Sequence, residues 1–207
     1  MEQRTDEWFA ARLGKVTASK VSDVVAKTKS GYGASRATYM SQLLVERLTG
    51  TRTEFYSNAA MQWGTDTEPQ ARAAYEFITN NSVVEEGFIS HPTIEMSGAS
   101  PDGLVNDDGM LEIKCPNTST HIQTLLDDKA PSKYINQMQW QMACAEEREW
   151  CDYVSFDPRM PEGNDFFCVR VDRDGDKIAE LEAEVMKFLG ELDEMVSTLN
   201  KRIKNNV

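Results

Sequence analysis

The sequence lacks any apolar run long enough to cross a lipid bilayer, and its first residues lack the apolar segment of a secretory signal peptide. These two absences exclude an integral membrane protein of the helical kind and argue against export. We therefore expect a cytoplasmic protein that makes no contact with a membrane.

The sequence also lacks the paired cysteines of a structural zinc site. It holds four cysteines, and no two of them form a C-x2-C pair. We expect these residues to be reduced thiols buried in the core of an intracellular protein.

Basic residues are scarce. The chain has 22 Lys and Arg against 34 Asp and Glu, a net charge of −12, which argues against a general nucleic-acid-binding protein. The charge is uneven, however, because residues 1–52 hold nine basic and five acidic residues, a net +4 that leaves −16 on the rest. This pattern suits a protein that holds nucleic acid in one local groove and repels it elsewhere.

Length and composition are those of an ordinary globular protein. The chain has 207 residues, of which 40% are apolar and 27% charged. We expect one domain over 1–207, with enough apolar side chains for a real core.

Periodicity and turn residues predict alternating helices and strands. Helices are expected near 5–12, 20–27, 34–48, 70–77, 121–126, 133–145 and 176–204. Strands are expected over 83–90, 93–97, 150–156 and 166–171, with a hairpin between 104 and 115. Residues 27–33 are predicted to be a flexible basic loop, and 51–60 an irregular segment.

The residues most suggestive of chemistry lie in the hairpin. Asp102 precedes its first strand, and Glu112 and Lys114 share one face of its second strand, because side chains in a strand alternate. Two carboxylates form an oxygen site suited to Mg²⁺, and a lysine beside them can orient or deprotonate a water. A solvated hairpin whose outer face carries Glu112 and Lys114 is the alternative, and the pattern alone does not separate the two.

Other candidates also have two interpretations. Glu68 is either a third carboxylate or a first-turn acid, since Pro69 suits the first turn of a helix. Gln137 and Gln141 are four residues apart on one face of a predicted helix. In the functional interpretation they reach a phosphate or a metal-bound water; in the other they belong to an amide-rich helix surface.

The N-terminal region contains a candidate anion site. Thr5 and Ser19 are each placed to cap a helix, and Arg12 lies between them. Small hydroxyls at a helix start together with an arginine bind anions, although capping and a surface arginine explain the same residues.

Several motifs, in order along nearly the whole chain, resemble the phage lambda exonuclease and YqaJ-type viral recombinase family of PD-(D/E)xK nucleases. They are Trp8–Ser19 (W-x3-R-L-G-x-V-T-A-S), Trp63–Glu68 (W-G-x3-E), Ser100–Gly103 (S-P-D-G), Glu112–Pro116 (E-I-K-C-P), Gln137–Gln139 (Q-x-Q) and Asp157–Met160 (D-P-R-M). Motifs that keep their order and spacing are far more specific than the acid-and-lysine pattern alone.

The resemblance implies a fold, an activity and partners. The fold is α/β, a central mixed β-sheet flanked by helices with a restriction-endonuclease-like core, here with a long C-terminal helix. The activity is Mg²⁺-dependent, 5′→3′ digestion of one strand of double-stranded DNA to mononucleotides, which leaves a 3′ tail for recombination by strand annealing. The partners are a single-strand annealing protein and two further copies in a ring-shaped homotrimer, in a bacterial host carrying the phage or prophage.

The resemblance also implies a metal centre with two Mg²⁺ ions, which Mn²⁺ can replace. Asp102 and Glu112 match its side-chain ligands, and the carbonyl of Ile113 matches a backbone ligand. Lys114 matches the catalytic lysine, and Glu68 matches an acid near the metals.

The remaining implied site residues contact substrate. Arg12, Ser19 and Ser100 match a pocket for the 5′-phosphate of the DNA end. Gln137 matches an active-site glutamine, and Lys29 falls where the family can direct a basic residue toward the DNA groove.

One position departs from the family pattern. Thr120 stands where the lambda enzyme has an arginine that helps hold the 5′-phosphate, which puts the preference for phosphorylated ends in doubt; the neighbouring His121 is a candidate substitute. An endonuclease of the same superfamily and a catalytically silent protein that binds a recombination partner are the open alternatives.

Overall fold

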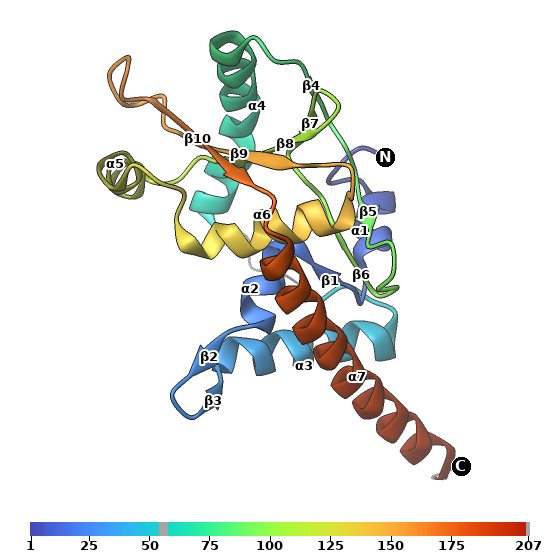
Figure 1. The fold of residues 1–207 in the computed structure, drawn as a ribbon. Coiled ribbons are helices and arrows are strands. Elements are labelled where there is room, and N and C mark those ends of the chain that lie inside the picture. Colours follow the sequence, from blue (N-terminus) through green and yellow to red (C-terminus); the bar gives the residue numbers. More distant parts are fainter. Residues whose placement is uncertain (54–57, 206–207) are drawn as a thin grey trace.

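The computed structural model describes residues 1–53 and 58–205, and within them an α/β fold surrounds a five-stranded mixed sheet (Figure 1). Its strands, in spatial order, are β10 (Phe166–Asp172), β9 (Trp150–Phe156), β8 (Gly109–Lys114), β7 (Gly103–Val105) and β4 (Val83–Val84). β8 and β9 are parallel, and the other neighbouring pairs are antiparallel. The mixed sheet expected from the sequence is therefore confirmed.

Two smaller sheets accompany it. β1 (Val16–Thr17), β6 (Ser97–Ala99) and β5 (Ile89–Ser90) form a three-stranded sheet, so the strands expected over 83–90 and 93–97 are in fact short separate pieces. β2 (Lys27–Thr28) and β3 (Gly31–Tyr32) pair as a hairpin. The prediction of a flexible loop at 27–33 is wrong, because Lys27 and Tyr32 both bond to Glu184 and tie the hairpin to the C-terminal helix.

The chain passes from β8 to the parallel β9 through two helices, α5 (Thr118–Asp127) and α6 (Ser132–Cys144). A parallel neighbour requires such a crossover. α6 packs on one face of the sheet, where Met138 and Met142 contact Met110 of β8 and Tyr153 of β9.

The opposite face of the sheet is covered by α4 (Ala59–Thr79), whose Ala71 and Tyr75 pack on Leu111 and Ile113 of β8. β8 therefore has both faces buried, with odd-numbered side chains toward α4 and even-numbered ones toward α6.

The hairpin between β7 and β8 forms as predicted, with Gly103 opposite Leu111. A Cβ at Gly103 would collide with the side chain of Val83, which explains the glycine of the S-P-D-G motif.

α4 is longer than predicted. It begins at Ala59, after the Asn58 side chain accepts a hydrogen bond from Met61 N, and Pro69 lies in its interior rather than in its first turn. A proline has no N–H to donate to the carbonyl four residues earlier, which is that of Thr65. Of the irregular segment predicted for 51–60, residues 54–57 lie outside the described residues.

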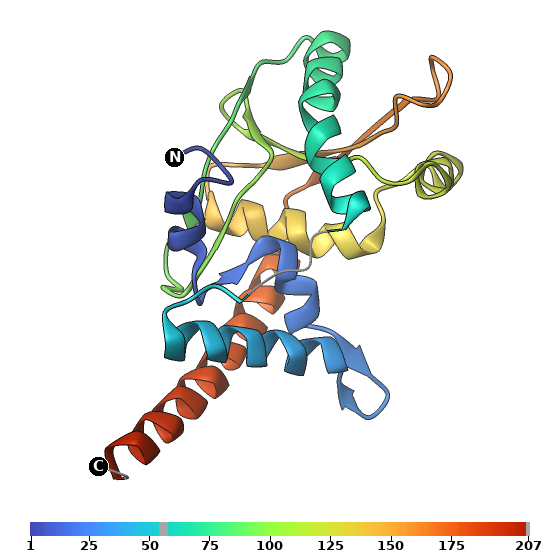
Figure 2. The same cartoon turned by 180° about the vertical axis from the view of Figure 1, so that it is seen from behind.

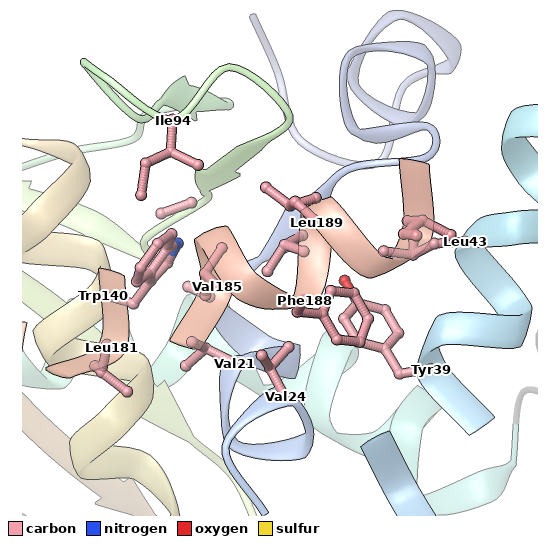
Figure 3. Packing of buried hydrophobic residues seen from close by; sticks show 14 of the residues in the cluster. Val21, Val24, Tyr39, Leu43, Ile94, Trp140, Leu181, Val185, Phe188 and Leu189 are labelled. Atoms are coloured by element: carbon pink, nitrogen blue, oxygen red, sulfur yellow. The ribbon is translucent and has the colours of Figure 1, made fainter. Parts of the chain in front are cut away.

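The largest apolar cluster lies away from the main sheet, where α7 (Gly175–Asn205) crosses α3 (Ala34–Thr49), α2 (Val21–Val24) and α6. Figure 3 shows its packing, with Phe188 of α7 stacked on Tyr39 of α3 and Trp140 of α6 nearby. The C-terminal end of α7 extends away from the sheet (Figure 2). No helix in 1–53 or 58–205 combines the length and the hydrophobicity that crossing a membrane requires.

Two residues of the N-terminal segment, Thr5 and Ser19, are predicted to cap helices. α1 (Asp6–Arg12) begins as expected, with the Thr5 hydroxyl accepting a hydrogen bond from Trp8 N. Ser19, by contrast, does not cap a helix, because it lies inside a 3₁₀ turn, η1 (Ala18–Lys20), that runs directly into the short α2.

Candidate active site

One cavity of about 630 Å³ brings together most of the predicted site residues. Its walls come from the N-terminal segment, α1, α4, the β7–β8 hairpin and α6, which are distant in sequence. The predicted residues that line it are Arg12, Ser19, Glu68, Ser100, Asp102, Ile113, Lys114 and Gln137.

Asp102 is fixed against the second strand of the hairpin. Its N–H donates to Leu111 O at 3.2 Å, and its Oδ2 accepts a hydrogen bond from Ile113 N at 2.7 Å. Burial, with the nearby charge of Glu112 adding to it, raises the pKa of Asp102 to about 8. Asp102 and Glu112 are therefore close enough to repel each other, as two ligands of one cation would be.

Glu112 is fully buried, which rules out the solvated-hairpin interpretation. Its two carboxylate oxygens accept hydrogen bonds from Gln137 Nε2 and Gln141 Nε2 of α6, each at 2.6 Å. The sequence indicates both glutamines by their spacing but gives no sign of this partner. The two amides hold the carboxylate in one orientation, and Oε2, which has Gln141 as its hydrogen-bond donor, keeps a further lone pair for a ligand.

Lys114 forms an ion pair with Glu112 Oε1, and its ammonium lies 5.2 Å from the centre of the Tyr134 ring. Burial by itself lowers the pKa of Lys114, but the charges of Glu112 and Asp102 outweigh this effect and raise the pKa above its ordinary value. Lys114 therefore carries its proton in the structure, next to both acids.

Glu68 lies in the same cavity, in the middle of α4. The alternative that it complements a helix dipole is wrong, because it is not in the first turn. Arg4 Nη2 binds Glu68 Oε2 at 2.6 Å, and Arg72 Nη2 binds Glu68 Oε1 at 3.0 Å. Arg72 lies four residues after Glu68, a spacing that a helix brings together, whereas the sequence pattern gives no signal for Arg4.

Arg12 and Ser100 meet at the wall of the cavity. Arg12 Nη1 and Trp8 Nε1 each donate to Ser100 Oγ at 2.9 Å, and the guanidinium lies 4.1 Å from the centre of the Trp8 ring. Burial lowers the pKa of Arg12 to about 10, and no carboxylate in the described part of the chain pairs with it. A half-buried cation that no carboxylate of the described residues neutralises fits an anion-binding role. Ser19 shares the cavity, and its hydroxyl lies 3.4 Å from that of Thr17.

Three predicted residues lie elsewhere. Lys29 is exposed in the turn of the β2–β3 hairpin and does not line the cavity. Thr120 is in the first turn of α5, where its N–H donates to Asn117 Oδ1. His121 cannot replace the missing arginine, because it is fully buried and its ring nitrogens contact Ser155 Oγ and the carbonyl of Asn164, each at 2.8 Å.

The residues present fit a hard divalent cation. Asp102 and Glu112 supply carboxylates and Ile113 a backbone carbonyl, the oxygen ligands that Mg²⁺ prefers when water and substrate complete its shell. Across residues 1–53 and 58–205, no group of three or more His, Cys, Asp and Glu side chains is placed to hold a metal. Mg²⁺ is seldom enclosed by protein ligands alone, so two carboxylates and one carbonyl are a set that fits it.

Known proteins resemble this chain in sequence and in fold. A family model described as a YqaJ-like viral recombinase domain matches residues 7–148. The crystal structure of an alkaline exonuclease, LHK-Exo from Laribacter hongkongensis, is 53% identical over 98% of this chain and 100% of that chain, with a TM-score of 0.92. The structure of LHK-Exo in complex with dAMP matches over the same shares at 53% identity, with a TM-score of 0.93.

A more distant structure bears on the fold alone. The phage related exonuclease from Haemophilus somnus 129PT is 16% identical over 89% of this chain and 96% of that chain, with a TM-score of 0.72. No curated protein sequence matches the chain. The family model covers more than half of the sequence, so the chain belongs to the YqaJ-like viral recombinase domain family.

Proposed function

We propose that this protein is a Mg²⁺-dependent exodeoxyribonuclease that digests one strand of linear double-stranded DNA from its 5′ end and releases mononucleotides. The observation that carries the proposal is the arrangement of one cavity, in which Asp102 and Lys114 lie beside buried Glu112 while Arg12 and Ser100 form a wall. The 53% identical Laribacter protein is an alkaline exonuclease and has been seen with dAMP, a deoxynucleoside monophosphate.

Each side chain has a role that follows from its contacts. Gln137 and Gln141 hold Glu112, and the Ile113 N–H holds Asp102, so the two acids keep a fixed separation. Lys114 carries its proton in the structure, so it would donate a hydrogen bond that orients the attacking water; it would take the proton of the water only after a cation at Glu112 had lowered its pKa and its own proton had passed to solvent. Bound Mg²⁺, two ions in this proposal, would supply charge stabilisation for the scissile phosphate and the leaving 3′ oxygen.

The wall of the cavity sets the polarity of digestion. The guanidinium of Arg12 and the hydroxyl of Ser100 bind the 5′-phosphate of the DNA end, with Ser19 nearby. A terminal phosphate held there fixes which phosphodiester bond lies over the acids. Because Thr120 replaces the family's arginine and His121 is engaged elsewhere, this pocket relies on fewer side chains than that of the lambda enzyme.

We further propose that the protein acts as a ring-shaped homotrimer in the host cytoplasm and hands its 3′ tail to a single-strand annealing protein. This part of the proposal rests on family membership. Light scattering tests the trimer, which has three times the 23.4 kDa of one chain. A mass of one chain at working concentration would contradict it.

Digestion of linear duplex labelled at either the 5′ or the 3′ end tests the activity and its polarity. With Mg²⁺, the 5′ label should appear early as a mononucleotide, while the 3′ label stays in long DNA. Early release of the 3′ label would overturn the polarity, and no release of either would favour a silent binding protein.

Covalently closed circular duplex distinguishes the remaining alternative. An exonuclease needs an end and should leave the circle intact, whereas an endonuclease of the same superfamily should cut it. Linearising the same circle with a restriction enzyme provides the matched substrate.

A further inference from the structure

Arg4, which no sequence motif singles out, is held in an unusual backbone conformation at the edge of the cavity. Its φ is +69°, a left-handed value that L-residues other than Asn and Asp seldom adopt. The neighbouring Gln3 side chain fixes this conformation, because its Nε2 donates to Glu86 O at 2.8 Å and to Pro101 O at 2.7 Å. The Arg4 side chain lines the same cavity as Asp102.

The two arginines that bind Glu68 differ in how firmly they are held. Arg72 is 14% exposed and has two further partners, with Nη1 on Glu85 and Nη2 on the carbonyl of Asp102. Arg4 is 47% exposed, and within residues 1–53 and 58–205 its side chain donates to Glu68 alone, at 2.6 Å. An ion pair this exposed exchanges its partners at little cost, whereas Arg72 is fixed.

The basic side chains that line the cavity are Arg4, Arg12 and Lys114. Lys114 is paired with Glu112, and the half-buried Arg12, bonded to Ser100, is the residue that the proposed function assigns to the 5′-phosphate. Arg4 is therefore the lining cation that can turn toward an incoming strand. A guanidinium matches the two-oxygen face of a phosphate as well as it matches that of a carboxylate.

We infer that Arg4 is a DNA-binding residue that exchanges the carboxylate of Glu68 for a backbone phosphate of the DNA strand in the cavity. In the absence of DNA, Glu68 neutralises Arg4 and holds it in place. This inference rests on the proposed function, since it needs DNA in this cavity. It supplies a second arginine contact in a chain that has Thr120 where the family has an arginine.

Binding of a linear, 5′-phosphorylated duplex measured in EDTA, so that no digestion occurs, tests the contact. Arg4→Gly is the variant of choice, because glycine accepts the left-handed backbone and removes only the side chain. Arg202→Ala, an exposed arginine near the end of α7 and outside the cavity, is the control for the loss of one positive charge. We expect Arg4→Gly to raise Kd several-fold and to reduce the slope of log Kd against log salt by about 1, and Arg202→Ala to change neither.

Glu68→Gln tests the exchange itself. If Glu68 competes with DNA for Arg4, this variant should bind the duplex more tightly than the wild type, and Glu68→Gln combined with Arg4→Gly should lose the gain. An equal gain in both backgrounds would show only a general effect of charge and would overturn the exchange.

The inference and the proposed function fail in different ways. If the wild type digests linear duplex but Arg4→Gly binds with the same Kd and salt slope as Arg202→Ala, the inference is wrong and the nuclease stands. If the wild type neither binds nor digests the duplex, the proposed function is wrong. Thermal unfolding of each variant checks that it is folded.

Discussion

Glu112 shows how a carboxylate can be fully buried and still available for chemistry. Gln137 and Gln141 each donate to one of its oxygens, and Lys114 supplies a positive charge. Burying a charge without such partners is prohibitively costly. The two amides that orient the carboxylate are neutral, so they leave its negative charge available to a cation. Lys114 is the one positively charged partner that a bound cation would have to displace in part.

Lys114 is the residue whose loss should separate hydrolysis from binding. Lys114→Ala removes the group that orients or deprotonates the water, so we expect nucleotide release to fall by about 100-fold or more. The Kd for duplex should stay close to that of the wild type, because Arg4 and Arg12 remain. Near-normal release by this variant would exclude the catalytic role; fluorescence anisotropy and a nucleotide-release assay measure the two quantities.

Arg12→Ala should distinguish between DNA ends. A charged hydrogen bond to the terminal phosphate is lost, so digestion of 5′-phosphorylated duplex should slow by about 10- to 100-fold. Digestion of 5′-hydroxyl duplex should change much less. Equal slowing on both substrates, measured as initial rates, would contradict a role in binding the 5′-phosphate. It would mean that Arg12 supports the fold or contributes to DNA binding in general.

Sequence reasoning predicts the site better than it predicts the contacts around it. The turn and the period of two in the hairpin place Asp102 beside Glu112 and Lys114, since both signals are local. The burial of Glu112 is not predictable in this way, because it depends on α6 packing over β8 from another part of the chain. The pairing of Glu68 with Arg4 is hidden for the same reason, because Arg4 is 64 residues away from it.

At the scale of elements, α4 departs most from what its sequence predicts. Proline usually marks the start of a helix, so local signals place the start of α4 ten residues too late. Packing of Ala71 and Tyr75 against the sheet holds the helix together across Pro69. α3, α6 and α7 are predicted well because their apolar periodicity coincides with the faces that are buried in the structure.

The start of α5 is fixed by a buried acid at the end of β9. Asp157 accepts hydrogen bonds from Thr118 Oγ1 at 2.7 Å and from Arg159 Nε at 2.7 Å, and Arg159 also reaches the carbonyl of Pro116. Burial by itself raises the pKa of Asp157, but the hydrogen bonds from Arg159 and Thr118 outweigh it and lower the pKa to about 2. The E-x-K-C-P segment is thus tied to the D-P-R-M segment.

This lowered pKa predicts how stability depends on pH. Asp in an unfolded chain has a pKa of about 3.9, so the contribution of Asp157 is fully present above about pH 4 and is lost as the pH falls toward 2. Urea unfolding of Asp157→Asn should show a loss of stability relative to the wild type that is largest above pH 4 and shrinks below it. Asp107→Asn, in the exposed hairpin turn, should show no such trend; a pH-independent difference for Asp157→Asn would contradict the prediction.

At the scale of the whole molecule, the charge distribution is the one that the proposed confinement of DNA to a single cavity requires. The chain carries −12 overall, yet its N-terminal quarter is positive and supplies Arg4 and Arg12 to the cavity. The acidic remainder repels DNA from the rest of the surface, so binding should weaken steeply with salt while remaining local. Weak binding confined to one cavity suits an enzyme that must advance along its substrate after every cleavage.

Nucleotide release from linear duplex, first in EDTA and then after Mg²⁺ is added in excess, tests the central claim most directly. The wild type should release nothing measurable in EDTA and should recover full activity with Mg²⁺. Asp102→Asn should stay inactive in both, while Asp107→Asn should behave like the wild type. Release in EDTA, or undiminished release by Asp102→Asn with Mg²⁺, would contradict a metal-dependent nuclease centre at Asp102, Glu112 and Lys114.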